Sequence, residues 1–437
     1  MRHHVSPMSE APHDPEGGSG VRAGVRHHLH PHRRTMVRIG VVSVAAIAVL
    51  AGIGGAIRAN RAQDRTPIEP GNVDQLHLDW TSDVGLGAIG GLSLEDGDLY
   101  VSTREGLVAF ALPCQPDASA PDDGCRPQWH GIVPDGPLST PVVHGDHVYA
   151  GSSSGQVYAF PSACPGNGCA PDWVGVAGTG AVSEPGVNED FVYVMSDRLY
   201  AFPSACGTQD RACPPAWSTS IPGRPADGPP AIGGGLVLVS SSSPGGGVFA
   251  FPAVCGGRCE PVWTGDTDGP ATAVAVSGQS AYVAARGRLL AFPLSCRGIC
   301  RPSWTSTFEP GGSFAPGARS APTVAGDLVY LGGDHGTLWV FPAACPHATC
   351  GPARSYDLSG TALHRPTVDA GLAYATSMDG TVYAVVDLCD PLAQVCDPPW
   401  SQSMGTHTDA APAVGAGAIY VGDDDGEVHA FTSGPGG

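Results

Sequence analysis

The chain has no lysine among its 437 residues and only four asparagines. Without lysine it cannot build a phosphate-binding P-loop, a Schiff base with a carbonyl substrate or the nucleotide-binding lysine of a protein kinase. It also lacks a Cys-x-x-Cys-His haem motif and a His-Glu-x-x-His zinc helix. No segment after residue 60 has the long apolar period of a capped helix. These absences exclude several enzyme classes and favour a fold made of strands.

What the chain does contain is a repeat. A strand-end residue, usually Phe, is followed by a cysteine, a short loop, a second cysteine and, in most copies, Pro-x-Trp. Successive strand ends are separated by 41 to 50 residues, the length of a four-stranded propeller blade. The strand ends are Phe110, Phe160, Phe202, Phe251, Phe292, Phe341, Val385 and Phe431.

Each repeat also contains short β-branched and aromatic runs with turns between them, such as 147–151 and 156–160 in the second repeat. A tryptophan after most cysteine loops marks a fourth, outer strand. Only seven outer strands follow the eight strand ends, and the strand at Trp80 can supply the eighth from the N-terminal side. We therefore predict an all-β, eight-bladed propeller over residues 73–437, closed by an N-terminal strand that leaves few free sheet edges.

Two repeats carry a family resemblance. They read Pro366-Thr-Val … Leu372-Ala-Tyr-Ala-Thr-Ser-Met-Asp-Gly380-Thr-Val-Tyr-Ala384 and Ala418-Ile-Tyr-Val … Asp425-Gly426-Glu-Val-His-Ala430, and a Trp-bearing strand closes such units. Over about residues 73–432 the chain resembles the PQQ-like (quinoprotein-type) β-propeller repeat family. That family includes quinone-dependent dehydrogenases and non-enzymatic envelope proteins, among them the outer-membrane assembly propeller. The resemblance implies the propeller fold. Within the family, we expect the chain to belong to the non-enzymatic envelope branch.

A quinone enzyme of this family needs placed carboxylates, an Asn or Asp ligand and, usually, an adjacent cysteine pair. No two cysteines are adjacent here, and Asn60 and Asn72 precede the blades. We therefore expect no bound cofactor and no catalytic residues.

All 14 cysteines fall into seven pairs with 3 to 10 residues between partners, and each pair brackets one loop between a third and an outer strand. Repetition therefore predicts seven local disulfides. Zinc is the alternative, but a structural zinc site needs four ligands and each loop offers two thiols. Disulfides indicate an oxidising, extracytoplasmic compartment. The pairs are Cys114–Cys125, Cys164–Cys169, Cys206–Cys213, Cys255–Cys259, Cys296–Cys300, Cys345–Cys350 and Cys389–Cys396.

Residues 39–57 form an uncharged, largely apolar run of 19 residues, about long enough to span a bilayer. More arginines precede this run than follow it, which favours a cytoplasmic N-terminus. We predict a disordered cytoplasmic tail (1–38), a transmembrane signal anchor (39–57) and a linker (58–72), so that a single-pass protein places its propeller outside the cell membrane. The alternative is a signal peptide, cleaved near residues 56–59, and a secreted protein.

The charge is divided between the two ends of the chain. Residues 1–65 hold nine arginines and four acidic residues, a net charge of +5, and residues 66–437 hold 13 arginines and 37 acidic residues, a net charge of −24. The acidic part would repel phosphate backbones, so we expect no nucleic-acid partner. Histidines at 27, 28, 30 and 32 could bind a transition metal, although a solvated tail is the favoured interpretation.

Two short motifs invite a functional interpretation. Residues 151–155 match Gly-x-Ser-x-Gly, but a nucleophile elbow needs a strand before it and a helix after it, and here strands flank both sides. Residues 423–427, Asp-Asp-Asp-Gly-Glu, look like part of a calcium loop but lack its ligand spacing. Both occupy the turn between the second and third strands of a repeat, so we interpret them as hairpin turns and expect no metal site.

If the ring binds a ligand, its site is expected at the central mouth, on the face that carries the outer-to-inner connectors; the favoured alternative is that the polar residues there are ordinary loop ends. Polar residues just before the inner strands would surround this mouth. The candidate residues are Glu184, Asp227, Arg319, His364, Arg365 and Asp409.

Together these features predict a membrane-anchored, extracytoplasmic propeller that acts as a binding or scaffold module in the cell envelope, without catalysis. Its partner would be an envelope protein or a small ligand. The alternative is an extracytoplasmic hydrolase, lyase or quinone-dependent dehydrogenase that uses the central mouth, and a solute sensor is a third, weaker hypothesis.

Overall fold

The structure is a computed structural model that describes residues 65–85, 87–114, 125–207, 212–256, 259–308, 320–358, 361–386 and 395–434. The chain divides into a unit of residues 1–53 and a unit of residues 54–437, and all described residues belong to the second. The predicted tail and the predicted transmembrane segment at 39–57 lie outside the described residues. Within the described part, the only helix is the 3₁₀ turn η1 (Val73–Gln75), and no helix has the length and apolar character needed to cross a bilayer.

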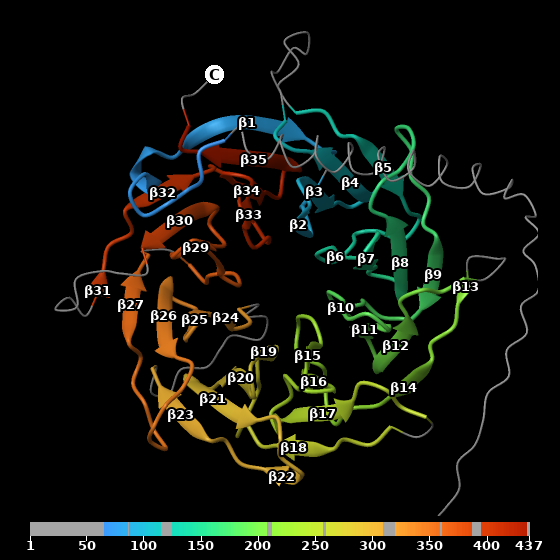
Figure 1. Ribbon diagram of the computed structural model, residues 1–437, viewed down its shortest axis with the longest axis vertical. Helices are drawn as coiled ribbons and strands as arrows, with labels where there is room; N and C mark the ends of the chain where they lie inside the picture. The colour runs from blue at the N-terminus through green and yellow to red at the C-terminus, as the bar shows by residue number, and fades with distance from the viewer. Residues whose placement is uncertain are drawn as a thin grey trace, which may run out of the picture. The chain divides into compact units, whose positions relative to one another are not determined.

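Eight sheets form a ring (Figure 1). Their innermost strands contact one another in the circular order β2, β6, β10, β15, β19, β24, β28, β33 and back to β2. The eight-bladed, all-β prediction is therefore confirmed. The inner strands are β2 (Gly91–Glu95), β6 (Val142–His144), β10 (Gly186–Val187), β15 (Ala231–Gly233), β19 (Ala275–Ser277), β24 (Thr323–Ala325), β28 (Thr367–Asp369) and β33 (Ala413–Gly415).

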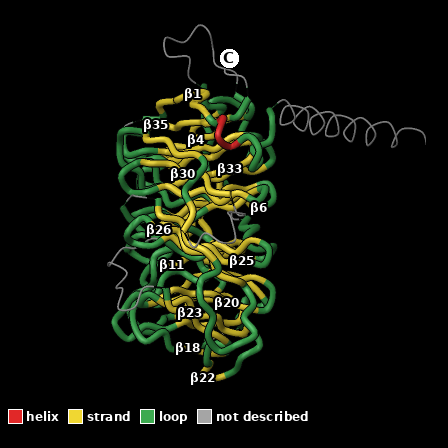
Figure 2. Tube along the Cα trace, turned by 90° about the vertical axis from the view of Figure 1, so that its left-hand side faces the viewer, coloured by secondary structure: helices red, strands yellow, loops and turns green. Residues whose placement is uncertain are grey.

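Three further antiparallel strands complete each blade, and Figure 2 shows the loops that join them on both faces of the ring. The second strands are β3 (Asp98–Ser102), β7 (His147–Gly151), β11 (Phe191–Met195), β16 (Leu236–Ser240), β20 (Ser280–Ala285), β25 (Leu328–Gly332), β29 (Leu372–Thr376) and β34 (Ala418–Gly422). The third strands are β4 (Gly106–Ala111), β8 (Gln156–Pro161), β12 (Leu199–Pro203), β17 (Val248–Pro252), β21 (Arg288–Pro293), β26 (Thr337–Pro342), β30 (Thr381–Val386) and β35 (Glu427–Thr432). The outer strands are β5 (Trp129–Ile132), β9 (Trp173–Val176), β14 (Trp217–Thr219), β18 (Trp263–Gly265), β23 (Trp304–Thr307), β27 (Arg354–Asp357), β32 (Trp400–Ser403) and β1 (His77–Asp83).

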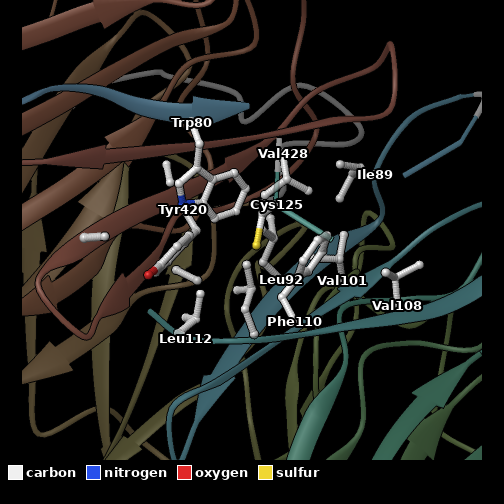
Figure 3. Packing of buried hydrophobic residues seen from close by; sticks show 14 of the residues in the cluster. Trp80, Ile89, Leu92, Val101, Val108, Phe110, Leu112, Cys125, Tyr420 and Val428 are labelled. Carbon is white, nitrogen blue, oxygen red and sulfur yellow. The ribbon is translucent and has the colours of Figure 1, made fainter. Parts of the chain in front are cut away.

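The last blade joins both ends of the propeller, as the count of outer strands predicts. Strand β1 pairs antiparallel with β35, with Trp80 opposite Ala430 and Thr81 opposite His429. Trp80 is only 3% exposed and packs between Phe110 of the first blade and Tyr420 of its own blade (Figure 3). We call the pairing of β1 with β35 the seam of the ring. Burial of the Trp80 side chain therefore stabilises the seam.

The aromatic strand ends fit a small residue on the preceding blade. A Cβ added at Gly131 of β5 would lie 2.6 Å from the ring of Phe160 in the next blade, and Gly175 and Gly265 face the next strand-end phenylalanine in the same way. These glycines allow the close approach of one sheet to the next.

One pair of blades shows the reverse fit. Where the strand end is Val385 instead of Phe, the preceding outer strand carries the large side chain of Tyr356, and both residues are buried in one cluster. The Tyr356 hydroxyl donates to the carbonyl of Val386 at 2.7 Å. At this interface the large side chain is on the preceding blade and the smaller one is at the strand end, so the total volume is kept, as close packing requires.

A tyrosine in the middle of the second strand also links neighbouring blades. The hydroxyls of Tyr100, Tyr193 and Tyr282 donate to backbone carbonyls just after the third strand of the following blade, at distances of 2.8 to 3.0 Å. Tyr149 makes the same bond at 3.3 Å, and burial, followed by the nearby charge of Asp146, raises its pKa to about 12.

Six of the seven predicted disulfides are formed in the described residues, with Cα–Cα distances from 5.6 to 6.2 Å. Such separations are normal for disulfides. The seventh pair, Cys389–Cys396, includes residues outside the described ones. The disulfide prediction is therefore confirmed for six loops, which indicates an oxidising environment.

Each disulfide loop also contacts the preceding blade. We call the segment that ends at the second cysteine of a pair the strap. Three straps add a parallel fifth strand to the neighbouring sheet. They are β13 (Ala212–Cys213) on β9, β22 (Gly298–Cys300) on β18 and β31 (Val395–Cys396) on β27.

The other straps make shorter contacts of the same kind. The N–H of Cys169 donates to the His130 carbonyl at 2.8 Å, and Cys350 donates to Thr305 at 3.1 Å. At the two remaining straps, the hydroxyls of Ser82 and Thr219 donate to the carbonyls of Cys125 and Cys259. The straps therefore form hydrogen bonds with outer strands whose edges would otherwise have no partner. They also join each blade to the one before it.

The outer edge of β32 has no strap, because the eighth repeat has no cysteine pair. The segment before β1 takes part of its place, since Trp400 Nε1 donates to the Leu76 carbonyl at 2.9 Å. Ser401, Gln402 and Ser403 remain exposed.

Replacing Cys164 and Cys169 together by serine should lower the free energy of unfolding by about 2 kcal/mol, because the bond closes a short loop in the unfolded chain. Urea unfolding of the oxidised proteins measures the difference, and a strong reductant should abolish it. Equal stability of the two oxidised proteins would contradict a stabilising staple.

The variant Val385→Phe should lose about 1–3 kcal/mol, because the larger ring overpacks the space beside Tyr356. Adding Tyr356→Ser, the residue type at the equivalent positions 82 and 306, should make this ring tolerable. Unfolding free energies of the two single variants and the double variant would then show a favourable coupling of about 0.5–3 kcal/mol. Simple additivity would mean that the two positions do not compete for volume.

Candidate functional site

The candidate site is the centre of the ring, on the face where connectors meet hairpin turns. After the first blade, the connector that follows the outer strand bonds to the turn of the next blade. Ser153 N–H donates to the Pro137 carbonyl, and near the seam Asp424 N–H donates to the His407 carbonyl. The structure thus confirms the expected arrangement of this face. The motif at 151–155 is a hairpin turn between β7 and β8, as expected, with the Ser152 hydroxyl accepting the N–H of Gln156 at 3.0 Å.

Proline at or near the start of six inner strands fixes the residues that reach the channel. Proline restricts the preceding residue to an extended conformation, so these residues enter the inner strands in the same way. The residues before proline are Thr140, Glu184, Pro229, Ala321, Arg365 and Ala411. Only Glu184 and Arg365 in this set are charged.

Arg365 and Glu184 form an ion pair across the channel, with Nη2 3.1 Å from Oε1. Arg365 precedes β28 and Glu184 precedes β10. The circular order of inner strands places these two strands four steps apart, on opposite sides of the ring. The side chains are 34% and 17% exposed, so the pair is partly shielded from water. Two residues far apart in sequence therefore bridge the channel.

Two cavities share Arg365 in their walls. The larger has a volume of about 450 Å³ and is bounded by inner-strand residues that include Ile232, Val276 and Val368. The smaller has a volume of about 210 Å³ and lies beside Leu92 and Thr140. A mostly apolar cavity with a few placed polar groups is the usual form of a small-molecule site, and the larger volume falls in the range of such sites.

The other predicted mouth residues are not part of this bridge. His364 is 5% exposed and its Nε2 lies 2.9 Å from the Thr408 carbonyl, so it holds two connectors together. Asp409 is half-buried and Asp227 is exposed, and neither lines the two cavities. Arg319 lies outside the described residues.

Asp409 has an acidic neighbour on the last hairpin turn. Burial, followed by the charge of Asp409, raises the pKa of Asp424. The nearby His407 opposes this effect. The connector and the turn therefore bring carboxylates together at the seam, beside the channel and not in it.

Comparisons with known proteins support the fold alone. No protein-family model and no curated protein matches the sequence. Among solved structures, BamB from Moraxella catarrhalis, a PQQ-like-repeat β-propeller, is similar at 17% identity with a TM-score of 0.55, covering 82% of this chain and 97% of that one. The computationally designed Ika8 protein (10% identity, TM-score 0.61, 81% of this chain and 99% of that one) and Saccharomyces cerevisiae Sqt1 (10%, 0.60, 81% and 98%) are also similar. These likenesses support the β-propeller fold.

A double-mutant cycle with Arg365→Ala, Glu184→Ala and the double variant measures the coupling between the two members of the channel pair. This coupling should be about 0.5–1 kcal/mol, because both groups are partly exposed. The coupling should fall at high salt, which screens such pairs. Arg288 and Asp268, a more exposed pair at 3.3 Å on the connector face, provide the control and should show less. A coupling that is zero at every salt concentration would contradict an electrostatic bridge.

Proposed function

We propose that the chain is a membrane-anchored, extracytoplasmic propeller that acts as a binding module in the cell envelope. Three observations support this proposal. The disulfides require an oxidising compartment, the run at 39–57 is long enough to anchor the chain, and the ring encloses a shaped channel. A closed ring of sheets is a rigid frame on which connectors can present a site.

The observation that carries the proposal is the position of Arg365 between the two cavities. A guanidinium offers a planar set of donors that suits carboxylate or phosphate. The wall around it is largely apolar, with Ala231, Val274 and Pro322 in the larger cavity. The ligand is therefore a compact anion with an apolar body, and its acidic group would replace Glu184 as the partner of Arg365.

The test is a thermal-shift screen of the full chain with small carboxylic acids, phosphorylated compounds, quinones, sugars and metal salts. A ligand that binds only the folded protein raises its melting temperature. We expect an acidic compound to raise it in the wild type, and Arg365→Ala should abolish the shift. Arg288→Ala is the matched control, because it removes an arginine outside the channel.

Two outcomes would count against this function. A shift that survives Arg365→Ala would place the ligand elsewhere. Turnover of a hydrolase or dehydrogenase substrate that Arg365→Ala or Asp409→Ala abolishes would favour the enzyme alternative.

A further inference from the structure

The hairpin turn of the last blade contains a carboxylate, and the turn uses only one of its two oxygens. Asp423 lies between β34 and β35, and its Oδ1 accepts the N–H groups of Asp425 and Glu427 at 3.1 and 2.8 Å. These bonds confirm the hairpin turn predicted for residues 423–427. They leave Oδ2 free for another partner.

Other blades build the same turn with a hydroxyl. Ser152 accepts the N–H of Gln156 at 3.0 Å, and Thr103 accepts the N–H of Gly106 at 3.2 Å. Because a neutral oxygen is sufficient there, the geometry of the turn does not explain the buried charge at Asp423. The repeats thus serve as internal controls for this position.

Two more ligand-type side chains face Asp423 from the third strand. His429 Nε2 lies 2.9 Å from Asp423 Oδ2 and 3.9 Å from Glu427 Oε2. One atom from each of the three residues falls within 4.8 Å of the others, in the only such group found among the described residues. The same three positions of the second blade hold Ser152, Gln156 and Tyr158, and no other blade has an acid or histidine at any of them.

A partner on β1 fixes the histidine ring. His429 Nδ1 lies 3.2 Å from Thr81 Oγ1, across the seam between the first and last strands of the propeller. Metal-binding histidines usually use their second nitrogen in this way, which orients the ring. A proton on His429 Nε2 accounts for its contact with Asp423 Oδ2. A metal ion would take the place of that proton, with Nδ1–H then donating to Thr81.

The distances suit a small cation. Tetrahedral coordination with bonds of about 2.0–2.2 Å needs ligand atoms about 3.3–3.5 Å apart. The observed 2.9 and 3.9 Å lie on either side of this value, so each contact has to change by only about half an ångström. The Asp423 side chain is fully buried and fixed, whereas that of Glu427 is 47% exposed and free to adjust.

We propose that Asp423, Glu427 and His429 form a binding site for a divalent transition-metal ion of the zinc type, with water at the open position next to Glu427. Two carboxylates neutralise the ion, and the imidazole selects zinc-type ions over Ca²⁺ and Mg²⁺, which prefer oxygen ligands. The strongly acidic propeller raises the local cation concentration. The site reaches β1 through Thr81, so the ion stabilises the seam of the ring.

The test measures zinc bound per chain after equilibrium dialysis. It uses the full chain in which histidines 27, 28, 30 and 32 are replaced by glutamine, so that this histidine-rich segment does not contribute to the zinc count. This parent should retain one zinc ion, and zinc should raise its melting temperature. Glu427→Gln and His429→Gln should each weaken binding by at least about tenfold and remove the thermal shift. Glu427→Gln changes a half-exposed side chain and keeps the fold testable.

Asp379→Asn is the matched control. Asp379 lies in the equivalent turn of the preceding blade, where it accepts the N–H of Thr381 at 3.2 Å, and Tyr383 occupies the position that corresponds to His429. This variant should bind zinc like the parent. The proposal is overturned if the parent binds no zinc, if Glu427→Gln and His429→Gln bind as much as the parent, or if Ca²⁺ or Mg²⁺ binds as tightly as Zn²⁺.

Discussion

The pairing of β1 with β35 is the contact on which the ring depends. Every other blade takes its four main strands from one continuous stretch of chain, but the last blade takes three from the C-terminal end and one from the N-terminal side. Without this pairing, β35 and the first blade would both expose edges and apolar faces to water. Trp80, Phe110 and Tyr420 show how the closure is secured, since the indole is buried between a ring of its own blade and a ring of the first blade.

The remaining interfaces repeat one scheme with matched variations. Phe160, Phe202 and Phe292 face glycine on the preceding blade, whereas Val385 faces Tyr356. The total volume at the interface is thereby kept, which is what a core with crystal-like packing demands. The straps add polar contacts at the rim, where an outer strand would otherwise have no partner.

Much of this architecture could be predicted from the sequence because the information repeats. The spacing of strand ends gives the blade length, the unmatched Trp80 strand gives the closure, and consecutive cysteines give the pairing. Six of the seven disulfides are confirmed, and the seventh stays a prediction. The anchor at 39–57 likewise remains a prediction.

The site could be predicted only in part. Sequence position alone placed Glu184 and Arg365 at the mouth, and the Pro that follows each of them was the usable signal. That the two side chains meet depends on the number of blades, because only a ring of eight sets the third blade opposite the seventh. His364 also precedes an inner strand, but it is followed by Arg365 instead of proline and turns into the structure to bind the Thr408 carbonyl. The sequence predicts a hairpin turn at residues 423–427, because this segment lacks the ligand spacing of a calcium loop. His429 gives no signal in the sequence, because it lies on the next strand and only the pairing of β34 with β35 brings it back beside Asp423.

The order of the cysteines has a consequence for how the protein is made. Each described disulfide joins a cysteine to the next one along the chain, over 4 to 11 residues. A chain that enters an oxidising compartment from its N-terminal side can therefore form each bond as soon as its second thiol emerges, and random reshuffling of thiols is not needed. The strand β1, by contrast, emerges first and has to wait for the last strand. Disulfide formation can thus proceed locally along the chain, whereas the ring can close only after β35 has emerged.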